Sequence, residues 1–172
     1  MTTTDFDAYI DSLPKILAGA STLFRDADGR ILIAETTYRE DGKWVLPGGT
    51  IESGDGETPR EAARRETLEE VGLDVEPGAL LTLDWVQWPG RPPLASYMYD
   101  GGVLDDATLK TIVLQEEELS AWRMATPEEA EEYLSPGLYR RVRAGLAALA
   151  DGGFPVELVN GRPPVRGQRP TA

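Results

Sequence analysis

The chain contains 172 residues, of which 41% are hydrophobic and 27% charged, a balance typical of one soluble globular domain rather than a disordered chain. Its net charge of −13 and its pI of about 4.4 argue against a nucleic-acid backbone or an anionic membrane as its main partner. Because the chain has neither cysteine nor histidine, its composition excludes disulfides, thiolate nucleophiles and imidazole bases, and any bound metal should be a hard ion with oxygen ligands, such as Mg²⁺ or Mn²⁺.

The beginning of the chain predicts neither an export signal nor a membrane anchor. Residues 1–15 are acidic and lack the apolar run of a signal peptide. No segment approaches the ~20 apolar residues that are needed to span a bilayer. We therefore expect a cytoplasmic protein.

The first third of the chain predicts a short helix and three strands. Two apolar segments are joined by an Asp-Ala-Asp-Gly turn, which is typical of a β-hairpin. A third apolar segment is interrupted by a proline and two glycines, which weaken a strand. In chain order these elements are a helix at 5–12, strands at 15–26 and 29–38, and a short strand at 43–51 that contains Pro47, Gly48 and Gly49.

The clearest helix is predicted at residues 59–71. Thr58 can cap it, Pro59 suits the first helical position, and Glu61 completes a capping box. Gly72 then ends the helix, since glycine readily takes the left-handed conformation found there.

The remainder of the chain alternates between strands and helices. The predicted fold class is therefore α/β in the α+β sense, with a mixed β-sheet and helices on both sides.

The arginines of the last helix, Arg140, Arg141 and Arg143, are interpreted as facing solvent. We expect one domain over residues 1–151, followed by a Pro/Gly/Arg-rich tail at 152–172 that forms a small hairpin at Asn160-Gly161 or an extended end. The predicted elements are strands at 79–88, 93–104, 111–114 and 121–125, and helices at 126–134 and 135–150.

Three glutamates crowd the last turns of the helix at 59–71. Glu66, Glu69 and Glu70 fan over roughly 100° of its surface, and like charges at such spacing cost a few tenths of a kcal/mol each. Arg65 can reach Glu69, but the residue four positions after Glu66 is Glu70, so the repulsion is retained. A solvated acidic face explains this pattern. A binding site for a divalent cation explains it too, because the Gly-Gly turn before the helix can add carbonyl oxygens.

The segment from Gly49 to Leu73 resembles the signature of the Nudix (MutT-like) hydrolase family. That signature is a glycine, a spacer, a glutamate, seven residues, and then Arg-Glu-apolar-x-Glu-Glu-x-Gly-apolar. Two positions depart from it: Thr67 replaces an apolar residue, and the spacer before Glu57 has seven residues, two more than is usual in the family. The matching residues are Gly49, Glu57 and the run Arg65-Glu66-Thr67-Leu68-Glu69-Glu70-Val71-Gly72-Leu73.

The resemblance implies an α/β/α sandwich and a Mg²⁺-dependent pyrophosphohydrolase. Such an enzyme directs water onto one phosphorus of a diphosphate that joins a nucleoside to another group. The metal ligands carried over from the family are the side chains of Glu66, Glu69 and Glu70 and the carbonyl of Gly49.

The resemblance also assigns supporting and catalytic roles. Arg65 would pair with Glu57 and brace the loop against the helix; an ordinary surface ion pair is the alternative. The candidate catalytic carboxylates are Glu66, Glu69 and Glu118. For the general base we prefer Glu118, in the acidic loop at 115–120, with Glu66 second, and a merely solvated loop stays open.

Substrate contacts are predicted from aromatic and basic residues. Trp85 and Trp88 can stack on a base, although aromatic residues on strands are often core. Arg39 and Lys43 can touch phosphates, or they are simply exposed loop charges. Pro89 lies sixteen positions after Leu73, similar to a proline marker of ADP-ribose-type Nudix enzymes, and this slightly favours ADP-ribose or a nucleotide sugar over a nucleoside triphosphate.

Two other readings stay open. The first is a catalytically inactive Nudix-fold sensor or scaffold that binds a nucleotide without cutting it, and the second is a purely structural acidic domain. The expected partner is a small nucleotide-diphosphate substrate rather than a nucleic acid or a membrane. A homodimer is compatible with the sequence.

Overall fold

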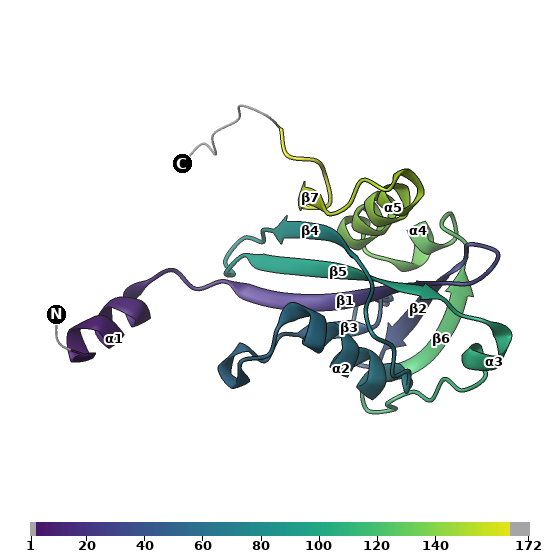
Figure 1. Ribbon diagram of the computed structural model, residues 1–172, viewed down its shortest axis with the longest axis horizontal. Coiled ribbons are helices and arrows are strands. Elements are labelled where there is room, and N and C mark those ends of the chain that lie inside the picture. The colour runs from purple at the N-terminus through teal and green to yellow at the C-terminus, as the bar shows by residue number, and fades with distance from the viewer. Residues whose placement is uncertain (1–2, 166–172) are drawn as a thin grey trace.

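The computed structural model describes residues 3–165 and contains one mixed sheet with helices on both faces (Figure 1). Within these residues, no helix combines the length and apolar character that crossing a bilayer requires. In chain order the elements are α1 (Thr3–Ser12), β1 (Leu17–Arg25), β2 (Ile31–Thr36), β3 (Gly48–Thr50), the 3₁₀ turn η1 (Ser53–Asp55), α2 (Pro59–Val71), β4 (Leu80–Val86), β5 (Leu94–Val103), α3 (Asp106–Leu109), β6 (Leu119–Ala125), α4 (Ala130–Tyr133), α5 (Pro136–Asp151) and β7 (Val156–Val159).

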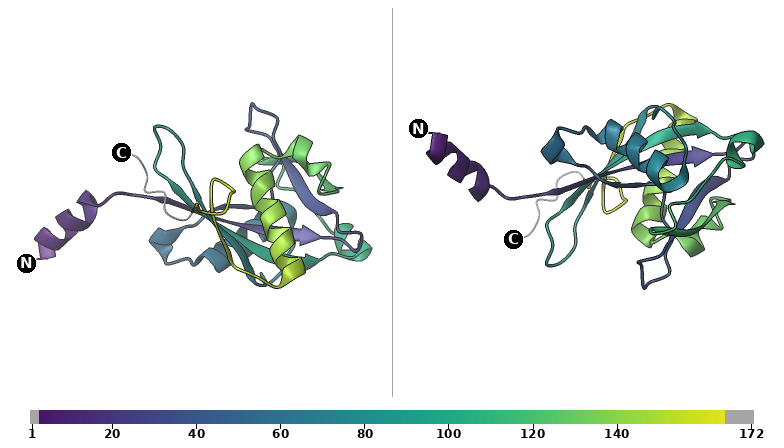
Figure 2. Two further views of the ribbon diagram at one scale, coloured as in Figure 1. Left: turned by 90° about the horizontal axis from the view of Figure 1, so that it is seen from above. Right: turned by 90° about the horizontal axis from the view of Figure 1, so that it is seen from below.

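The sheet has seven strands and the order β6-β2-β1-β5-β4-β7, with β3 paired to β1 beside this path. The central pair β1–β5 and the edge pair β4–β7 are parallel, and the other pairs are antiparallel. Seen from above, α5 crosses one face of the sheet, and from below α2 covers the other (Figure 2). The predicted mixed sheet with helices on both sides is confirmed.

The strands at the centre of the sheet are apolar on both faces because each face is covered. On β2, Ile31 and Ile33 join the core beneath α5, whereas Leu32 and Ala34 join the core at the end of α2, and all four are fully buried. A strand buried on both faces therefore reads as a continuous apolar run rather than as an alternating one.

The prediction of a strand at 111–114 is wrong. Residues 106–109 form the short helix α3, which is capped by Asp105, and the segment after α3 runs alongside the C-terminal end of α2. The Val113 amide donates to the Val71 carbonyl, and the Gln115 amide donates to that of Glu70. The apolar side chains at 112 and 114 thus cover the core beneath α2. This segment therefore borders the acidic helix.

The predicted turn at Asn160-Gly161 is present. Both residues have positive φ, 52° and 74°, as a tight two-residue β-turn requires, and a single bridge joins Val159 to Arg162. The strand before the turn, β7, pairs in parallel with β4 and so forms an edge of the main sheet. The last part of the predicted tail, 166–172, lies outside the described residues.

Candidate active site

The loop and helix that carry the acidic residues are positioned by β3. Its three residues pair with β1, and the chain then passes through η1 into α2. The predicted capping box is confirmed, because the Thr58 side chain accepts from the Glu61 amide while the Glu61 side chain accepts from the Thr58 amide. Gly72 ends the helix in the left-handed conformation, with φ of 73°, as predicted.

The two glycines of the loop are required by close packing. Gly48 has φ of +146°, and a β-carbon there would overlap the backbone of β1. A β-carbon on Gly49 would lie 2.5 Å from Oε1 of Glu66. The backbone of β3 can therefore lie directly against the carboxylates of α2 only because these side chains are missing. In this arrangement the Gly48 amide donates a 2.7 Å hydrogen bond to Oε2 of Glu70.

Glu70 is a buried carboxylate, only 4% exposed. Burial raises the pKa of this group to about 8, even though the Gly48 amide opposes the shift, and the nearby charges of Glu66, Glu118 and Glu69 raise the pKa further. A group in this environment carries negative charge at a cost in free energy, which a bound cation would remove.

Glu66 lies beside Glu70 in a similar environment. Burial raises the pKa of its carboxyl group, the Arg65 guanidinium lowers it in part, and the charges of Glu69 and Glu118 raise it again. Its Oε1 accepts a 3.0 Å hydrogen bond from Arg65. The two carboxylates are thus held against the glycine loop from adjacent turns of the helix.

Arg65 ties the loop to the helix. Its guanidinium donates to Glu57 at 2.7 and 3.1 Å, to Glu66 at 3.0 Å, to Glu69 at 2.9 Å and to the Thr50 carbonyl at 3.1 Å. The hydrogen bond from Arg65 lowers the pKa of Glu57. The predicted ion pair is therefore present, and the longer spacer before Glu57 contains the turn η1.

The donors match a hard divalent ion in kind, since buried carboxylates with raised pKa values are oxygen ligands whose charge lacks compensation. Glu70 meets this description fully, and Glu66 meets it in part, because its Oε1 also accepts from Arg65. The more exposed Glu69 carboxylate is bonded to Arg65 as well, and within residues 3–165 no group of three acidic side chains has the spacing of a metal cage. The site thus offers two carboxylates beside the Gly49 backbone, and the three glutamates predicted as ligands are not gathered in this conformation.

Glu118 is brought to the same place by the loop before β6. The amide and hydroxyl of Thr37 donate to carbonyls of this loop, including that of Glu118, and the loop begins where Gln115 bonds to the end of α2. Glu118 is half-buried, and its charge raises the pKa of both Glu66 and Glu70. Its neighbours at 116 and 117 are exposed.

Tyr38 is a further residue of this cluster that the sequence did not single out. Loss of water around its hydroxyl raises its pKa, and the charges of Glu70, Glu118 and Glu66 contribute in the same direction. The residue lies two positions after the end of β2, and its sequence environment carried no signal of this position.

A cleft extends from the glycine loop along the face of the sheet that α5 covers. Its first part, of about 360 Å³, is bordered by the glycine loop, Ser96, Leu138 and Arg141. Its second part, of about 470 Å³, shares Leu138 and Arg141 and adds Arg39 and Trp88. Two of the four residues predicted to bind substrate, Arg39 and Trp88, thus line one cleft that ends at the glycine loop.

The structure does not bring the other two predicted substrate residues to this cleft. Lys43 donates to the Glu132 carbonyl at 2.7 Å, on α4. Trp85 alternates along β4 with Asp84, whose side chain contacts α5, and therefore points to the opposite face of the sheet.

The expectation that Arg141 faces solvent is wrong. Its side chain is 11% exposed and donates to Oδ2 of the fully buried Asp84 at 3.0 and 2.9 Å. The other oxygen of Asp84 accepts from the Gly161 amide, so the pair joins β4, α5 and the turn after β7 on the floor of the cleft. No sequence signal links these residues, because the partners lie 57 positions apart.

The packing of α2 also explains why a polar residue, Thr67, can stand at a position that is apolar in the family signature. Thr67 is buried, and its hydroxyl donates to the Ala63 carbonyl at 2.7 Å and contacts the Thr22 hydroxyl at 3.0 Å. The hydroxyl is satisfied within the helix and by β1, so this departure leaves the packing of α2 intact.

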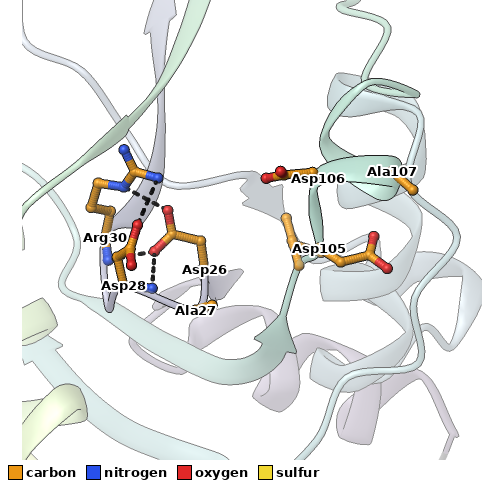
Figure 3. A pocket seen from close by; sticks show the side chains of 8 residues that line it. Asp26, Ala27, Asp28, Arg30, Asp105, Asp106 and Ala107 are labelled. Atoms are coloured by element: carbon orange, nitrogen blue, oxygen red, sulfur yellow. Dashed lines mark hydrogen bonds and ion pairs between the residues drawn. The ribbon is translucent and has the colours of Figure 1, made fainter.

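A separate hollow of about 450 Å³ lies between the turn after β1 and the start of α3 (Figure 3). Asp26 and Arg30 form a 2.6 Å ion pair on its wall, opposite Asp105 and Asp106. Because β3 pairs with the other half of β1, this hollow is remote from the glycine loop.

Comparison with known proteins identifies the arrangement. The model of the NUDIX domain matches residues 15–145. The chain is 36% identical over 78 residues to an RNA pyrophosphohydrolase of Dinoroseobacter shibae, covering 44% of this chain and 48% of that protein. It is 35% identical over 74 residues to an 8-oxo-dGTP diphosphatase of Proteus vulgaris, covering 42% and 64% respectively. The chain thus spans less than two thirds of the length of these relatives.

Solved structures show the same fold. The MutT protein of Methanosarcina mazei Go1 superposes with a TM-score of 0.63 at 21% identity, over 83% of this chain and 100% of that one. The NUDIX domain of Shewanella oneidensis NrtR, complexed with ADP ribose, superposes with a TM-score of 0.69 at 15% identity, over 87% and 99%. Together with the match over residues 15–145, these findings show that the chain belongs to the Nudix family.

Proposed function

We propose that this protein is a divalent-metal-dependent pyrophosphohydrolase that cleaves the diphosphate of a nucleoside diphosphate derivative. Nudix hydrolases generally use divalent metal ions, and we expect Mg²⁺ or Mn²⁺ here because the donors are carboxylates. The single observation that carries the proposal is the pair Glu66 and Glu70, which are held with raised pKa values against the glycine loop where the cleft ends.

The roles of the residues follow from their positions. Glu66 and Glu70 would hold the ion, with the Gly49 carbonyl and Glu69 completing its ligands once the Glu66 and Glu69 carboxylates turn from Arg65. When bound, the ion neutralises phosphate oxygens and lowers the pKa of its water. Glu118 would accept the proton of the attacking water, because it is half-buried beside both glutamates.

The cleft leaves space for a group on one side of the diphosphate. Beyond the glycine loop it continues past Arg141 to Trp88 and Arg39, which leaves space for a ring to stack beyond the phosphates. On the position of Pro89, sixteen residues after Leu73, we favour ADP-ribose or a nucleotide sugar over a nucleoside triphosphate. The ADP ribose bound to the Shewanella domain supports this order, whereas the names of the curated relatives make triphosphates a necessary comparison.

The test is a panel of substrates incubated with the full chain and Mg²⁺, with products identified by mass. The panel contains ADP-ribose, nucleotide sugars, dinucleoside polyphosphates, 8-oxo-dGTP and ordinary triphosphates. Glu118→Gln should lower kcat by about 10²–10⁴-fold, the usual contribution of a general base. Glu117→Gln is the matched control, since it makes the same change on the same loop at an exposed position, and it should retain activity.

The alternative is a Nudix-fold sensor that binds a nucleotide without cutting it. It predicts that ADP-ribose raises Tm while no member of the panel is consumed. A Glu118→Gln variant as active as the wild type would leave the hydrolase intact and move the role of base to Glu66. No turnover of any substrate with Mg²⁺ or Mn²⁺ would overturn the hydrolase proposal.

A further inference from the structure

The second part of the cleft beneath α5 is basic, although the protein as a whole is strongly acidic. The chain has 17 lysines and arginines against 30 aspartates and glutamates. Around this part of the cleft, which measures about 470 Å³, the balance is reversed, because the described residues that line it include three arginines and one acidic residue. These residues are Arg39, Arg140, Arg141 and Asp84. We call this part the distal cleft.

Two of the three arginines are already neutralised. Arg141 donates two hydrogen bonds to Oδ2 of the buried Asp84. Arg39 donates to both oxygens of Asp41, at 3.0 and 2.6 Å. Each of these positive charges is balanced by a carboxylate, so the two pairs shape the distal cleft but leave it little free charge.

Arg140 is the exception. Its Nε and Nη2 donate to the Asn160 carbonyl at 3.3 and 3.0 Å, and no acidic side chain of residues 3–165 forms an ion pair with it. A carbonyl oxygen orients a guanidinium but does not neutralise it. Within the same residues Nη1 has no hydrogen-bond partner, and the side chain is only half-buried. Arg140 therefore offers the distal cleft an uncompensated positive charge with N–H groups free to donate.

The turn that holds Arg140 is itself fixed to the sheet. The Asn160 amide donates to the Trp85 carbonyl at 3.1 Å, and the Asn160 side-chain oxygen accepts from the Gln87 amide at 2.8 Å. A β-carbon on Gly161 would lie 3.0 Å from Cβ of Arg140, so the turn packs directly against α5. Because the guanidinium is held in place before any ligand arrives, it loses less conformational freedom on binding.

The chemistry of a guanidinium selects the ligand. Its planar set of donors matches the oxygens of a phosphate or a carboxylate, with which it forms charge-assisted hydrogen bonds. The net charge of −13 repels such a group from the protein surface in general, so a local positive charge is needed to retain it. The distal cleft supplies that charge.

The position of the distal cleft links this anion to the substrate. Leu138 and Arg141 line both parts of the cleft, which runs without interruption to the glycine loop. A molecule whose diphosphate lies at the glycine loop can therefore extend to Arg140, with a ring beside Trp88. The anion at Arg140 would then belong to the same molecule as the diphosphate.

We propose that the distal cleft binds a second anionic group of the substrate, a phosphate or a carboxylate, and that Arg140 recognises it. The substrate class is then a nucleoside diphosphate derivative that carries such a group on the half of the molecule that enters the cleft. The inference rests on the proposed function for the place of the diphosphate. Binding of an anion at Arg140 does not require that the diphosphate be cleaved.

The first test measures binding of probes that contain no diphosphate bond, by calorimetry with the full chain in Mg²⁺. Adenosine 2′,5′-bisphosphate and adenosine 3′,5′-bisphosphate are compared with AMP, which tests the nucleoside half of a substrate. Glucuronic acid 1-phosphate is compared with glucose 1-phosphate, which tests the other half. In at least one comparison the probe with the second anion should bind at least about tenfold more tightly, the usual effect of one charge-assisted hydrogen bond.

Three variants assign this preference to Arg140. Arg140→Gln keeps an amide that can donate to the Asn160 carbonyl but removes the charge, and it should abolish the preference. Arg140→Lys restores the charge and should restore part of it, which a purely structural role in the turn would not do. Arg143→Gln makes the same change in net charge at an exposed position of α5 and should keep the preference in full. No preference in the wild type, or one that survives Arg140→Gln, would overturn the proposal.

The second test measures kcat and KM for matched substrates. ADP-ribose 2′-phosphate is compared with ADP-ribose, and UDP-glucuronate with UDP-glucose. The member with the second anion should have the higher kcat/KM by about tenfold or more, mainly through a lower KM, and Arg140→Gln should collapse the ratio. A ratio that Arg140→Gln leaves intact defeats this inference but not the hydrolase. If no substrate is turned over, the hydrolase proposal fails, and the binding comparison alone decides whether Arg140 recognises an anion.

Discussion

The Glu70 carboxylate is buried, and its one hydrogen bond comes from the Gly48 amide; no arginine or lysine of residues 3–165 contacts it. Its raised pKa means that the folded, metal-free protein carries this charge at a cost in stability. Glu70 therefore lowers the stability of the metal-free protein but supplies an oxygen ligand for a cation. Residues of active sites commonly reduce stability in this way.

We therefore predict that Glu70→Gln stabilises the protein in a chelator. The neutral amide keeps an acceptor for the Gly48 amide and removes the buried charge, so Tm should rise by roughly 2–4 °C per kcal/mol gained. Glu69→Gln is the control, because Glu69 is half-exposed and bonded to Arg65, and its loss should not raise Tm. Thermal unfolding in EDTA at pH 8 measures both variants. A lower Tm for Glu70→Gln would show that the Glu70 charge is compensated in the fold.

Asp26 shows the opposite electrostatic balance (Figure 3). Burial alone would raise its pKa, but hydrogen bonds from the Arg30 side chain and from backbone amides outweigh that effect, and the pKa is lowered. A carboxyl group with a depressed pKa stabilises the folded state above its unfolded value of 3.8, and this contribution is lost as the pH falls through the folded value.

Asp26→Asn should accordingly destabilise the protein at neutral pH. The expected loss is about 1 kcal/mol, since Arg30 is partly exposed and solvent screens the pair. The difference from the wild type should shrink as the pH drops below 3.8, where the wild-type group also becomes protonated. Urea unfolding at pH 7 and near pH 3 checks this. A difference that stays constant with pH would mean that packing, rather than charge, is responsible.

Among the elements, α2 was predictable from the sequence because its signals are local. The cap at Thr58, the proline after it and Gly72 all act within a few residues, so the predicted and observed bounds agree. The segment 111–114 was not predictable, because its backbone partners are at the end of α2 rather than on a neighbouring strand. The effect of the two-residue insertion in the spacer was not predictable, because no local signal indicates that the spacer forms η1 and that Glu57 still pairs with Arg65.

The same contrast between local signals and long-range contacts applies to the candidate site. The acidic helix could be predicted from residue spacing alone, but the residues on the floor of the cleft could not. Asp84 and Arg141 lie on different elements, and an arginine on an exposed-looking helix is usually solvated. Their pairing depends on where α5 crosses β4, and that crossing is a property of the packed sheet.

The ion pair between Asp84 and Arg141 leads to a prediction about what holds α5 against β4. Asp84→Asn should destabilise the protein by about 3–5 kcal/mol, because it leaves the Arg141 charge buried without its partner. Arg141→Met combined with Asp84→Asn should recover much of that loss, since no buried charge then remains. A double-mutant cycle in urea measures the coupling. Additive losses would show that the two side chains act independently.

The net charge of −13 affects the stability of the protein as a whole. Self-repulsion disfavours the compact state, and added salt screens it, so NaCl should raise Tm whether or not a metal site exists. MgCl₂ supplies the same screening and also binds the carboxylates of α2. Stabilisation by Mg²⁺ alone is therefore no proof of a site, and only the excess over NaCl at equal ionic strength reports one.

We predict such an excess, and we predict that it depends on two residues. At a concentration about 100 times the dissociation constant, Mg²⁺ should add ~2.7 kcal/mol beyond screening. Glu66→Gln and Glu70→Gln should abolish the excess while keeping the response to NaCl, whereas Asp105→Asn, at the remote acidic hollow, should keep both. Thermal shifts in matched salts separate these cases. If all three variants retained the excess, Mg²⁺ would be binding diffusely to the acidic surface, and the assignment of Glu66 and Glu70 as ligands would have to be withdrawn.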